Sequence, residues 1–192
     1  MSKLSNRILL YAPATAVLTL VALFFTISYL NSIAPAGIII HHSAVAPPFD
    51  GTPVDAPTID RIHKRRGYEI FYWGKFYNIG YHYVILPDGT VQKGRPELLQ
   101  GSHTEGYNSY IGICLVGNFS SADNAAGSRG LSTPTEAQIN ALIELCRSLQ
   151  QRYNFPPERI LRHSDVSPKS ECPGDRFPFE EFRARLKTSE NR

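Results

Sequence analysis

The chain has 192 residues, of which 42% are hydrophobic, and its formal net charge is +3. That length accommodates one compact domain and an appendage. Lys3 and Arg7 supply two of the excess positive charges, so the rest of the chain is nearly neutral and nucleic-acid binding is not indicated. The chain has three cysteines, an odd number, which excludes a framework built only of disulfide bonds.

The N-terminal region carries a long apolar run. Residues 8–30 contain no charged side chain, and as a helix they would span roughly 35 Å, enough for a hydrocarbon core of about 30 Å. We therefore expect a transmembrane signal-anchor helix at about 8–30, within an N-terminal part that covers residues 1–36. Because basic residues precede the run, the positive-inside rule places the N-terminus in the cytoplasm and the rest on the periplasmic or extracytoplasmic side. The alternative is a signal peptide cleaved after Ala36, but the length of the run favours a retained anchor.

The sequence predicts one domain at residues 37–187 and a short tail at residues 188–192. The domain begins with a β-branched run at 37–43, which is typical of a buried strand. After a Pro-rich loop, residues 58–67 predict a short helix that ends at Gly67.

A hairpin and another strand follow. Residues 80–96 predict a β-hairpin, because two alternating runs flank Asp88 and Gly89. Residues 110–119 predict a second buried strand, and residues 120–132 have the composition of a loop.

The best-defined helix is predicted at residues 133–153. Thr133 and Glu136 have the spacing of a capping box, and Pro134 would occupy the first helical position. One apolar face follows the 3.6-residue period and comprises Ile139, Leu142, Ile143, Cys146 and Leu149.

The domain closes with a short extended segment at 159–165 and a helix at 177–186. Strands interleaved with helices predict an α/β fold, with a central mixed β-sheet flanked by helices. Cys114 and Cys146 lie in apolar patterns and are expected to be buried thiols. A bridge between them in an oxidising compartment is the less favoured alternative.

The stretch "RHSDVSPKSECPG" carries the chemistry. His163 and Cys172 offer two zinc ligands from one loop, and catalytic zinc sites use three protein ligands and keep one position open. The third ligand must come from elsewhere, and His41 and His42 end the first predicted strand. Successive strand side chains point to opposite faces, so only one of this pair can enter a common site.

Four motifs occur in order: "IIIHHSA", "GYHYVILPDGTVQKGRP", "GSHTEGYNSYIGICLVGNF" and "RHSDVSPKSECPG". Together they resemble the zinc-dependent N-acetylmuramoyl-L-alanine amidases, a family that includes phage amidases long named lysozymes and the peptidoglycan recognition proteins of animals. The resemblance covers about residues 37–186.

The resemblance implies that His41, His163 and Cys172 bind Zn²⁺. It also implies that Tyr81 is catalytic beside the metal and that a loop residue assists it. Counting from "SPK" makes that residue Lys169, whereas counting back from the cysteine favours Ser170.

Five further residues are considered in or near the site. Some members carry a catalytic glutamate in the "IGIE" pattern, whereas this chain has Cys114 there, as phage members do. His103 is expected to line the substrate groove, or else to be a hydrogen-bonded loop residue. His42 is expected to be structural, as are His63 and His82 unless they are solvated.

The stretch 68–78 holds six aromatic side chains. The favoured interpretation is a satellite hydrophobic cluster under a loop. The alternatives are a stacking platform for sugar or stem peptide, and contact with a membrane surface.

These implications predict an enzyme that cleaves the amide between N-acetylmuramic acid and L-alanine of the stem peptide with a zinc-activated water. Its partners would be peptidoglycan and, through the N-terminal helix, a membrane. The alternatives are a non-catalytic peptidoglycan-binding module of the same fold and a zinc amide hydrolase that acts on another acylated peptide.

Overall fold

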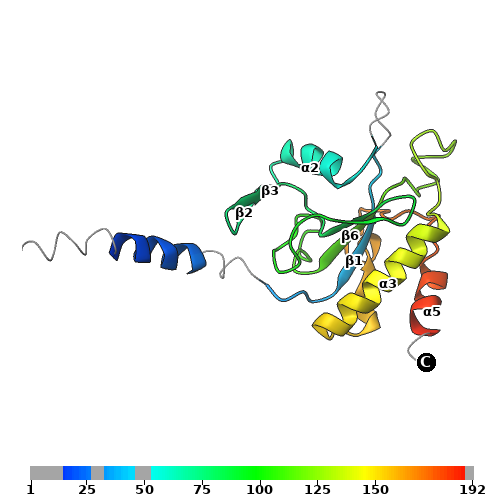
Figure 1. Ribbon diagram of the computed structural model, residues 1–192. Coiled ribbons are helices and arrows are strands. Elements are labelled where there is room, and N and C mark those ends of the chain that lie inside the picture. Colours follow the sequence, from blue (N-terminus) through cyan, green and yellow to red (C-terminus); the bar gives the residue numbers. More distant parts are fainter. Residues whose placement is uncertain (1–14, 27–32, 46–52, 189–192) are drawn as a thin grey trace, which may run out of the picture.

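The computed structural model describes residues 15–26, 33–45 and 53–188 (Figure 1). Its centre is a five-stranded sheet in the order β5-β4-β6-β1-β7. The strands are β1 (Ile38–His42), β4 (Tyr83–Ile85), β5 (Val91–Lys93), β6 (Ile111–Leu115) and β7 (Ile160–Arg162). The β1–β6, β1–β7 and β4–β6 pairs are parallel, and β4 pairs with β5 in the antiparallel sense. The sheet is therefore mixed, as predicted.

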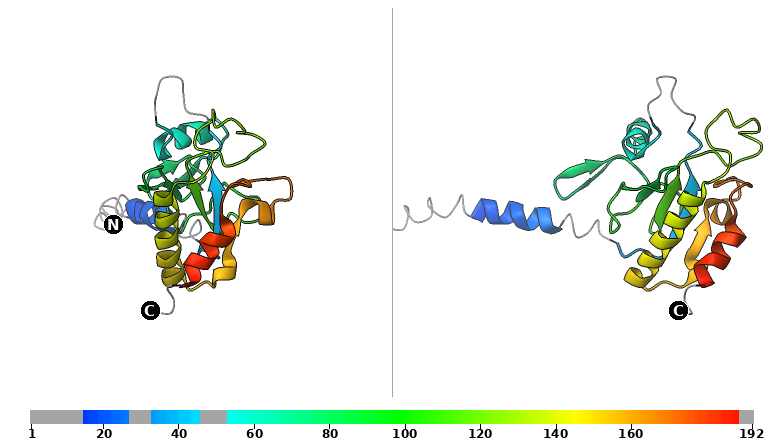
Figure 2. Two further views of the ribbon diagram at one scale, coloured as in Figure 1. Left: turned by 90° about the vertical axis from the view of Figure 1, so that its right-hand side faces the viewer. Right: turned by 45° about the vertical axis from the view of Figure 1, so that its right-hand side comes forward.

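Helices cover both faces of the sheet. Helix α2 (Ala56–Lys64) lies on one side, and α3 (Glu136–Tyr153) and α5 (Phe179–Thr188) lie on the other (Figure 1 and Figure 2). A 3-10 turn, η1 (Pro157–Arg159), precedes β7, and the short helix α4 (His163–Val166) follows it directly. The α/β prediction is confirmed.

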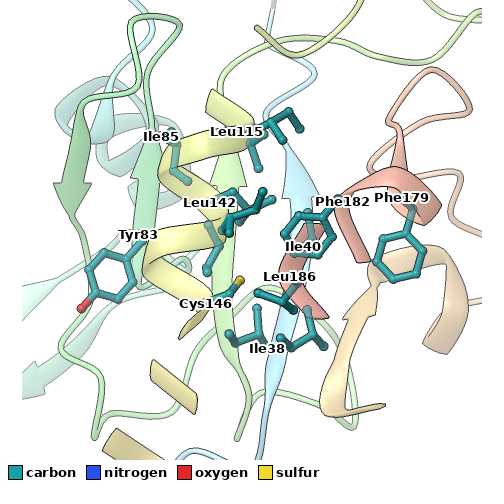
Figure 3. Close-up of a cluster of buried hydrophobic side chains, with 14 of the residues drawn as sticks. Ile38, Ile40, Tyr83, Ile85, Leu115, Leu142, Cys146, Phe179, Phe182 and Leu186 are labelled. Atoms are coloured by element: carbon teal, nitrogen blue, oxygen red, sulfur yellow. The ribbon is translucent and has the colours of Figure 1, made fainter. Parts of the chain in front are cut away.

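The two faces of the sheet bury two separate apolar clusters because strand side chains alternate. Ile38 and Ile40 point toward α3 and α5, where they join Leu142, Cys146 and Phe182 (Figure 3). On the other face a smaller cluster lies beneath α2 and comprises Val54, Ala56, Ile59, Ile79, Val84, Cys114 and Val116.

Cys114 and Cys146 are both buried free thiols. They belong to the clusters on opposite faces of the sheet. The expectation of buried thiols is confirmed, and the sheet between the two cysteines rules out the alternative bridge.

Helix α3 begins two residues later than the predicted capping box implies. Its N-cap is Thr135, whose hydroxyl accepts from the N–H of Gln138, while the Gln138 side chain accepts from the N–H of Thr135. The fully buried Gln138 amide also donates to the carbonyls of Ile85 and Val116, both at 3.0 Å. Because these bonds tie Gln138 to the ends of β4 and β6, Gln138 completes the capping box in place of Glu136. The predicted Thr133–Glu136 box was therefore wrong.

The aromatic stretch forms its own hairpin of β2 (Ile70–Tyr72) and β3 (Lys75–Tyr77). Trp73 and Gly74 make the turn with φ values of 48° and 79°, the left-handed conformation that two-residue hairpin turns need. The hairpin side chains Phe71, Trp73 and Phe76 are 37%, 51% and 56% exposed. The favoured interpretation, a buried satellite cluster, was therefore wrong for these three rings.

The N-terminal prediction needs correction. Among the described residues, no helix combines the length and the apolar character needed to cross a bilayer. Within the predicted span, residues 15–26 are helical, and residues 8–14 and 27–30 lie outside the described part. The predicted transmembrane anchor, and with it the placement of the domain beyond a membrane, was wrong. The Phe24 and Phe25 rings lie 5.7 Å and 5.3 Å from the ring of Trp73.

Residues 33–36, which precede the predicted domain, are hydrogen-bonded to it. Ile33 donates its N–H to the carbonyl of Leu98, and Ala36 donates its N–H to the carbonyl of Ser109. These bonds lead the chain directly into β1.

Candidate metal centre

The two histidines at the end of β1 have separate roles, as alternation predicts. His42 lies on the α3 side, where its Nδ1 accepts the backbone N–H of Phe119 at 3.0 Å. His41 lies on the α2 side and is 1% exposed. Its ring centroid is 4.7 Å from that of His163.

The other two candidate ligands come from the segment that follows β7. Parallel pairing of β7 with β1 places the two strand ends together, so His163, the first residue of α4, lies beside His41. The loop after α4 turns back, and the N–H of Ser164 donates to the carbonyl of Cys172 at 2.8 Å. This bond holds the two ends of the loop together.

The geometry of His41, His163 and Cys172 fits a metal ion. One nitrogen or sulfur atom from each residue lies within 4.8 Å of the others, and Sγ of Cys172 is 3.6 Å from Nδ1 of His41. Zinc bonds of about 2.05 Å to nitrogen and about 2.3 Å to sulfur at a tetrahedral angle separate two ligand atoms by about 3.6 Å. Three protein ligands leave a fourth position open, as in catalytic zinc sites.

The second nitrogen of each histidine is already engaged. Nδ1 of His163 lies 3.1 Å from the hydroxyl of Ser170, which leaves Nε2 for a metal. Nε2 of His41 lies 3.0 Å from Nδ1 of His103, which leaves Nδ1 for a metal. Such outer partners orient ligating imidazoles and fix their tautomers.

Burial controls the charges of the site. It lowers the pKa of His41 well below its ordinary value, with His103 and His163 acting in the same direction, and it lowers the pKa of His163. Both imidazoles are therefore neutral at neutral pH, which is the state that binds metal. Burial raises the pKa of Cys172 to about 12, and the His42 N–H that donates to Sγ at 3.3 Å opposes this shift.

Tyr81 lies beside the three ligands. Its ring centroid is 5.0 Å from that of His41 and 5.2 Å from that of His63. Burial raises its pKa well above the ordinary value, so the hydroxyl keeps its proton. No residue in the described part of the chain forms a hydrogen bond with that hydroxyl, which makes it a donor available to a bound substrate.

The two candidate loop residues differ in their surroundings. Lys169 is exposed. The Ser170 hydroxyl points inward, where it contacts Nδ1 of His163 and accepts the N–H of Cys172 at 3.2 Å. Ser170 therefore supports two candidate ligands, whereas the exposed Lys169 contacts neither of them in the described structure.

The remaining histidines are placed around this centre. His63 accepts the N–H of Gly80 on Nδ1, and His82 accepts the N–H of Gly112 on Nδ1 while Nε2 contacts the carbonyl of Leu99. Both are buried, as expected of structural residues. Burial lowers the pKa of His103 to about 3, so that ring is neutral as well.

Sequence reasoning missed Thr104 and Asn108. The Thr104 hydroxyl lies 3.4 Å from Nε2 of His41. The Asn108 side chain accepts the N–H groups of His103 and Thr104 at 2.9 Å and 3.0 Å. Both residues lie in the motif "GSHTEGYN", but only the fold shows that this loop faces His41.

The chain is similar to several known proteins in sequence and in fold. A family model described as N-acetylmuramoyl-L-alanine amidase matches residues 31–175. The endolysin of Enterobacteria phage T3 is 38% identical over 138 residues, which cover 71% of this chain and 78% of the phage protein. The endolysin of Klebsiella phage KP32 is 35% identical over 137 residues, with 71% and 78% covered. The solved structure of the endolysin N-acetylmuramoyl-L-alanine amidase LysCS from Clostridium intestinale URNW is 38% identical with a TM-score of 0.62, over 80% of this chain and 84% of that one.

Proposed function

Because the chain belongs to the N-acetylmuramoyl-L-alanine amidase family, we propose that it hydrolyses peptidoglycan with zinc as its cofactor. The bond cleaved is the amide between the lactyl group of N-acetylmuramic acid and L-alanine of the stem peptide. The products are a glycan strand with a free lactyl carboxylate and a peptide with a free α-amino group on L-alanine.

The observation that supports this proposal most strongly is the convergence of His41, His163 and Cys172. These side chains come from two segments that are far apart in sequence, and their donor atoms match the preferences and spacing of a three-ligand zinc site. A bound zinc ion would supply Lewis-acid chemistry, lowering the pKa of water and polarising a carbonyl.

The chain's own groups supply the other requirements of amide hydrolysis. The Tyr81 hydroxyl, protonated and available as a donor beside His41, donates to the scissile carbonyl oxygen as negative charge develops on it. The Lys169 ammonium stabilises the same charge from the loop. Cys114, which is fully buried among apolar side chains, has a strongly raised pKa and offers no general base.

Cys172 distinguishes an enzyme from a binding module of the same fold. A thiol with a pKa of about 12 is a poor nucleophile at neutral pH, but it becomes a thiolate when it coordinates a cation. The backbone N–H of His42 donates to the sulfur and stabilises the thiolate form. A module without catalysis has no need of this arrangement.

Digestion of purified peptidoglycan, followed by mass analysis, tests the proposal. The zinc-loaded protein should release stem peptides that begin with free L-alanine, and a chelator should stop the release. Wall that is retained but not cut would identify a binding module instead. Uncut wall together with cleavage of other N-acylated peptides would identify a different amide hydrolase.

A further inference from the structure

The His103 ring connects a candidate metal ligand to a backbone carbonyl. Its Nδ1 lies 3.0 Å from Nε2 of His41, and its Nε2 lies 3.0 Å from the carbonyl oxygen of Tyr110. The three groups form a continuous chain of hydrogen bonds that ends on the protein backbone.

This chain of hydrogen bonds allows one arrangement of protons. A carbonyl oxygen only accepts, so Nε2 of His103 carries the proton that it receives. A neutral imidazole has one donor and one acceptor nitrogen, so Nδ1 of His103 accepts and Nε2 of His41 must donate. The lone pair of His41 then lies on Nδ1, the atom 3.6 Å from Sγ of Cys172.

We propose that His103 is a positioning residue that fixes His41 in the tautomer able to bind the metal. The Tyr110 carbonyl holds His103 in turn, because it accepts the proton on Nε2 of His103. This inference rests on the proposed function, because it concerns the same zinc site. It assigns His103 a task that differs from lining the substrate groove.

Two glycines leave the space that the His103 ring occupies. A Cβ atom on Gly112 would lie 2.6 Å from Cδ2 of His103, and a Cβ on Gly101 would lie 2.4 Å from the same atom. Any larger residue at either position would force the imidazole out of place. The sheet strand β6 and the start of the loop therefore both make room for His103.

Hydrogen bonds also fix the backbone of the loop that carries His103. Asn108 accepts the N–H groups of His103 and Thr104, and Gly101 donates its N–H to the carbonyl of Asn108 at 2.8 Å. The Thr104 hydroxyl oxygen lies 3.1 Å from Nδ1 of His103 and 3.4 Å from Nε2 of His41, where it is a second acceptor for the proton on Nε2 of His41.

The tautomer of His41 can be measured directly in metal-free protein. Long-range ¹H–¹⁵N NMR correlations distinguish protonated from unprotonated imidazole nitrogens. We expect Nε2–H on both His41 and His103. Finding His41 with its proton on Nδ1 in the wild-type protein would overturn the proposal, whatever the activity of the enzyme.

Two substitutions separate this role from a general effect on folding. In His103→Leu the acceptor is lost, and we expect zinc affinity, measured by competition with a chromophoric chelator, to fall about 10–100-fold. In His103→Asn the side-chain oxygen can occupy the place of Nδ1, so affinity should stay within a few-fold of wild type. Equal losses in both variants, or no loss in His103→Leu, would contradict the proposal.

These outcomes are distinct from a failure of the proposed function. If wild-type protein binds no zinc, the enzyme assignment fails, and the NMR measurement still decides the tautomer. If wild-type protein binds zinc and cleaves wall while His103→Leu binds zinc equally well, only the positioning role is rejected.

Discussion

The Sγ atom of Cys172 lies 3.6 Å from Nδ1 of His41, although 131 positions separate the two residues in the chain. The contact arises because β7 pairs in parallel with β1 and the loop after α4 returns to the end of β1. The fold therefore brings a half-buried thiol and a neutral imidazole together with His163 at the ends of β1 and β7.

The first prediction concerns proton release on zinc binding. Burial raises the pKa of Cys172 to about 12, so the metal-free thiol is protonated at every pH between 5 and 9. Both histidine ligands have lowered pKa values and carry no extra proton near neutrality. Zinc coordination should therefore displace one proton, and affinity should rise about tenfold per pH unit.

Calorimetric titration with zinc near pH 6, repeated in buffers of different ionisation enthalpy, counts the protons released. A value close to one supports a protonated thiol in the metal-free site. Zero would mean that Cys172 is already a thiolate, and a larger number would mean that the histidines are charged before zinc binds.

Tyr81→Phe tests the role of the free hydroxyl. Removing one donor to a developing oxyanion typically lowers kcat by about 10²–10³, and zinc content should not change because Tyr81 is not a ligand. Tyr83→Phe is the matched control, since the Tyr83 hydroxyl bonds to Glu97 instead of facing the site. An active Tyr81→Phe enzyme would remove this residue from the mechanism.

Lys169 and Ser170 should give different phenotypes. Ser170→Ala removes the hydroxyl that contacts His163 and accepts the N–H of Cys172, so zinc affinity should fall about tenfold or more. Lys169→Ala should keep zinc affinity and lose hydrolytic rate. Chelator competition and wall digestion on both variants decide between them, and a reversal of the two phenotypes would contradict the assignment.

A prediction of stability follows from the cap of α3. Thr135→Ala loses the bond to the N–H of Gln138 and the bond donated to the carbonyl of Pro87 at 2.7 Å, which should lower the free energy of unfolding by about 1–2 kcal/mol. Thr133→Ala, at an exposed residue that precedes the helix, should change it by less than about 0.5 kcal/mol. Urea unfolding of both variants checks this, and a larger effect at Thr133 would restore the cap predicted from sequence.

The strands and the ligand-bearing motifs could be predicted because their signals are local. The run before His41 is uniformly β-branched, and the Asp88-Gly89 turn carries a specific hairpin signal. Alternation alone separated His41 from His42, and the structure places them on opposite faces as expected.

Features that depend on tertiary contacts could not be predicted from local patterns. The cap of α3 moved to Thr135 because Gln138 bonds to carbonyls at the ends of two strands. The contact between His103 and His41 depends on the packing of a loop against β6, which no spacing in "GSHTEGYN" reveals. The apolar run at 8–30 has the composition of a membrane span, but no helix among the described residues qualifies as one.

Zinc content per chain tests the three-ligand site most directly. After zinc loading and dialysis, elemental analysis of the wild-type protein should find about one zinc per chain, and Cys172→Ala should retain almost none and fail to cleave peptidoglycan. A wild-type protein without zinc, or a Cys172→Ala variant that holds zinc and digests wall at the wild-type rate, would contradict this account of the site.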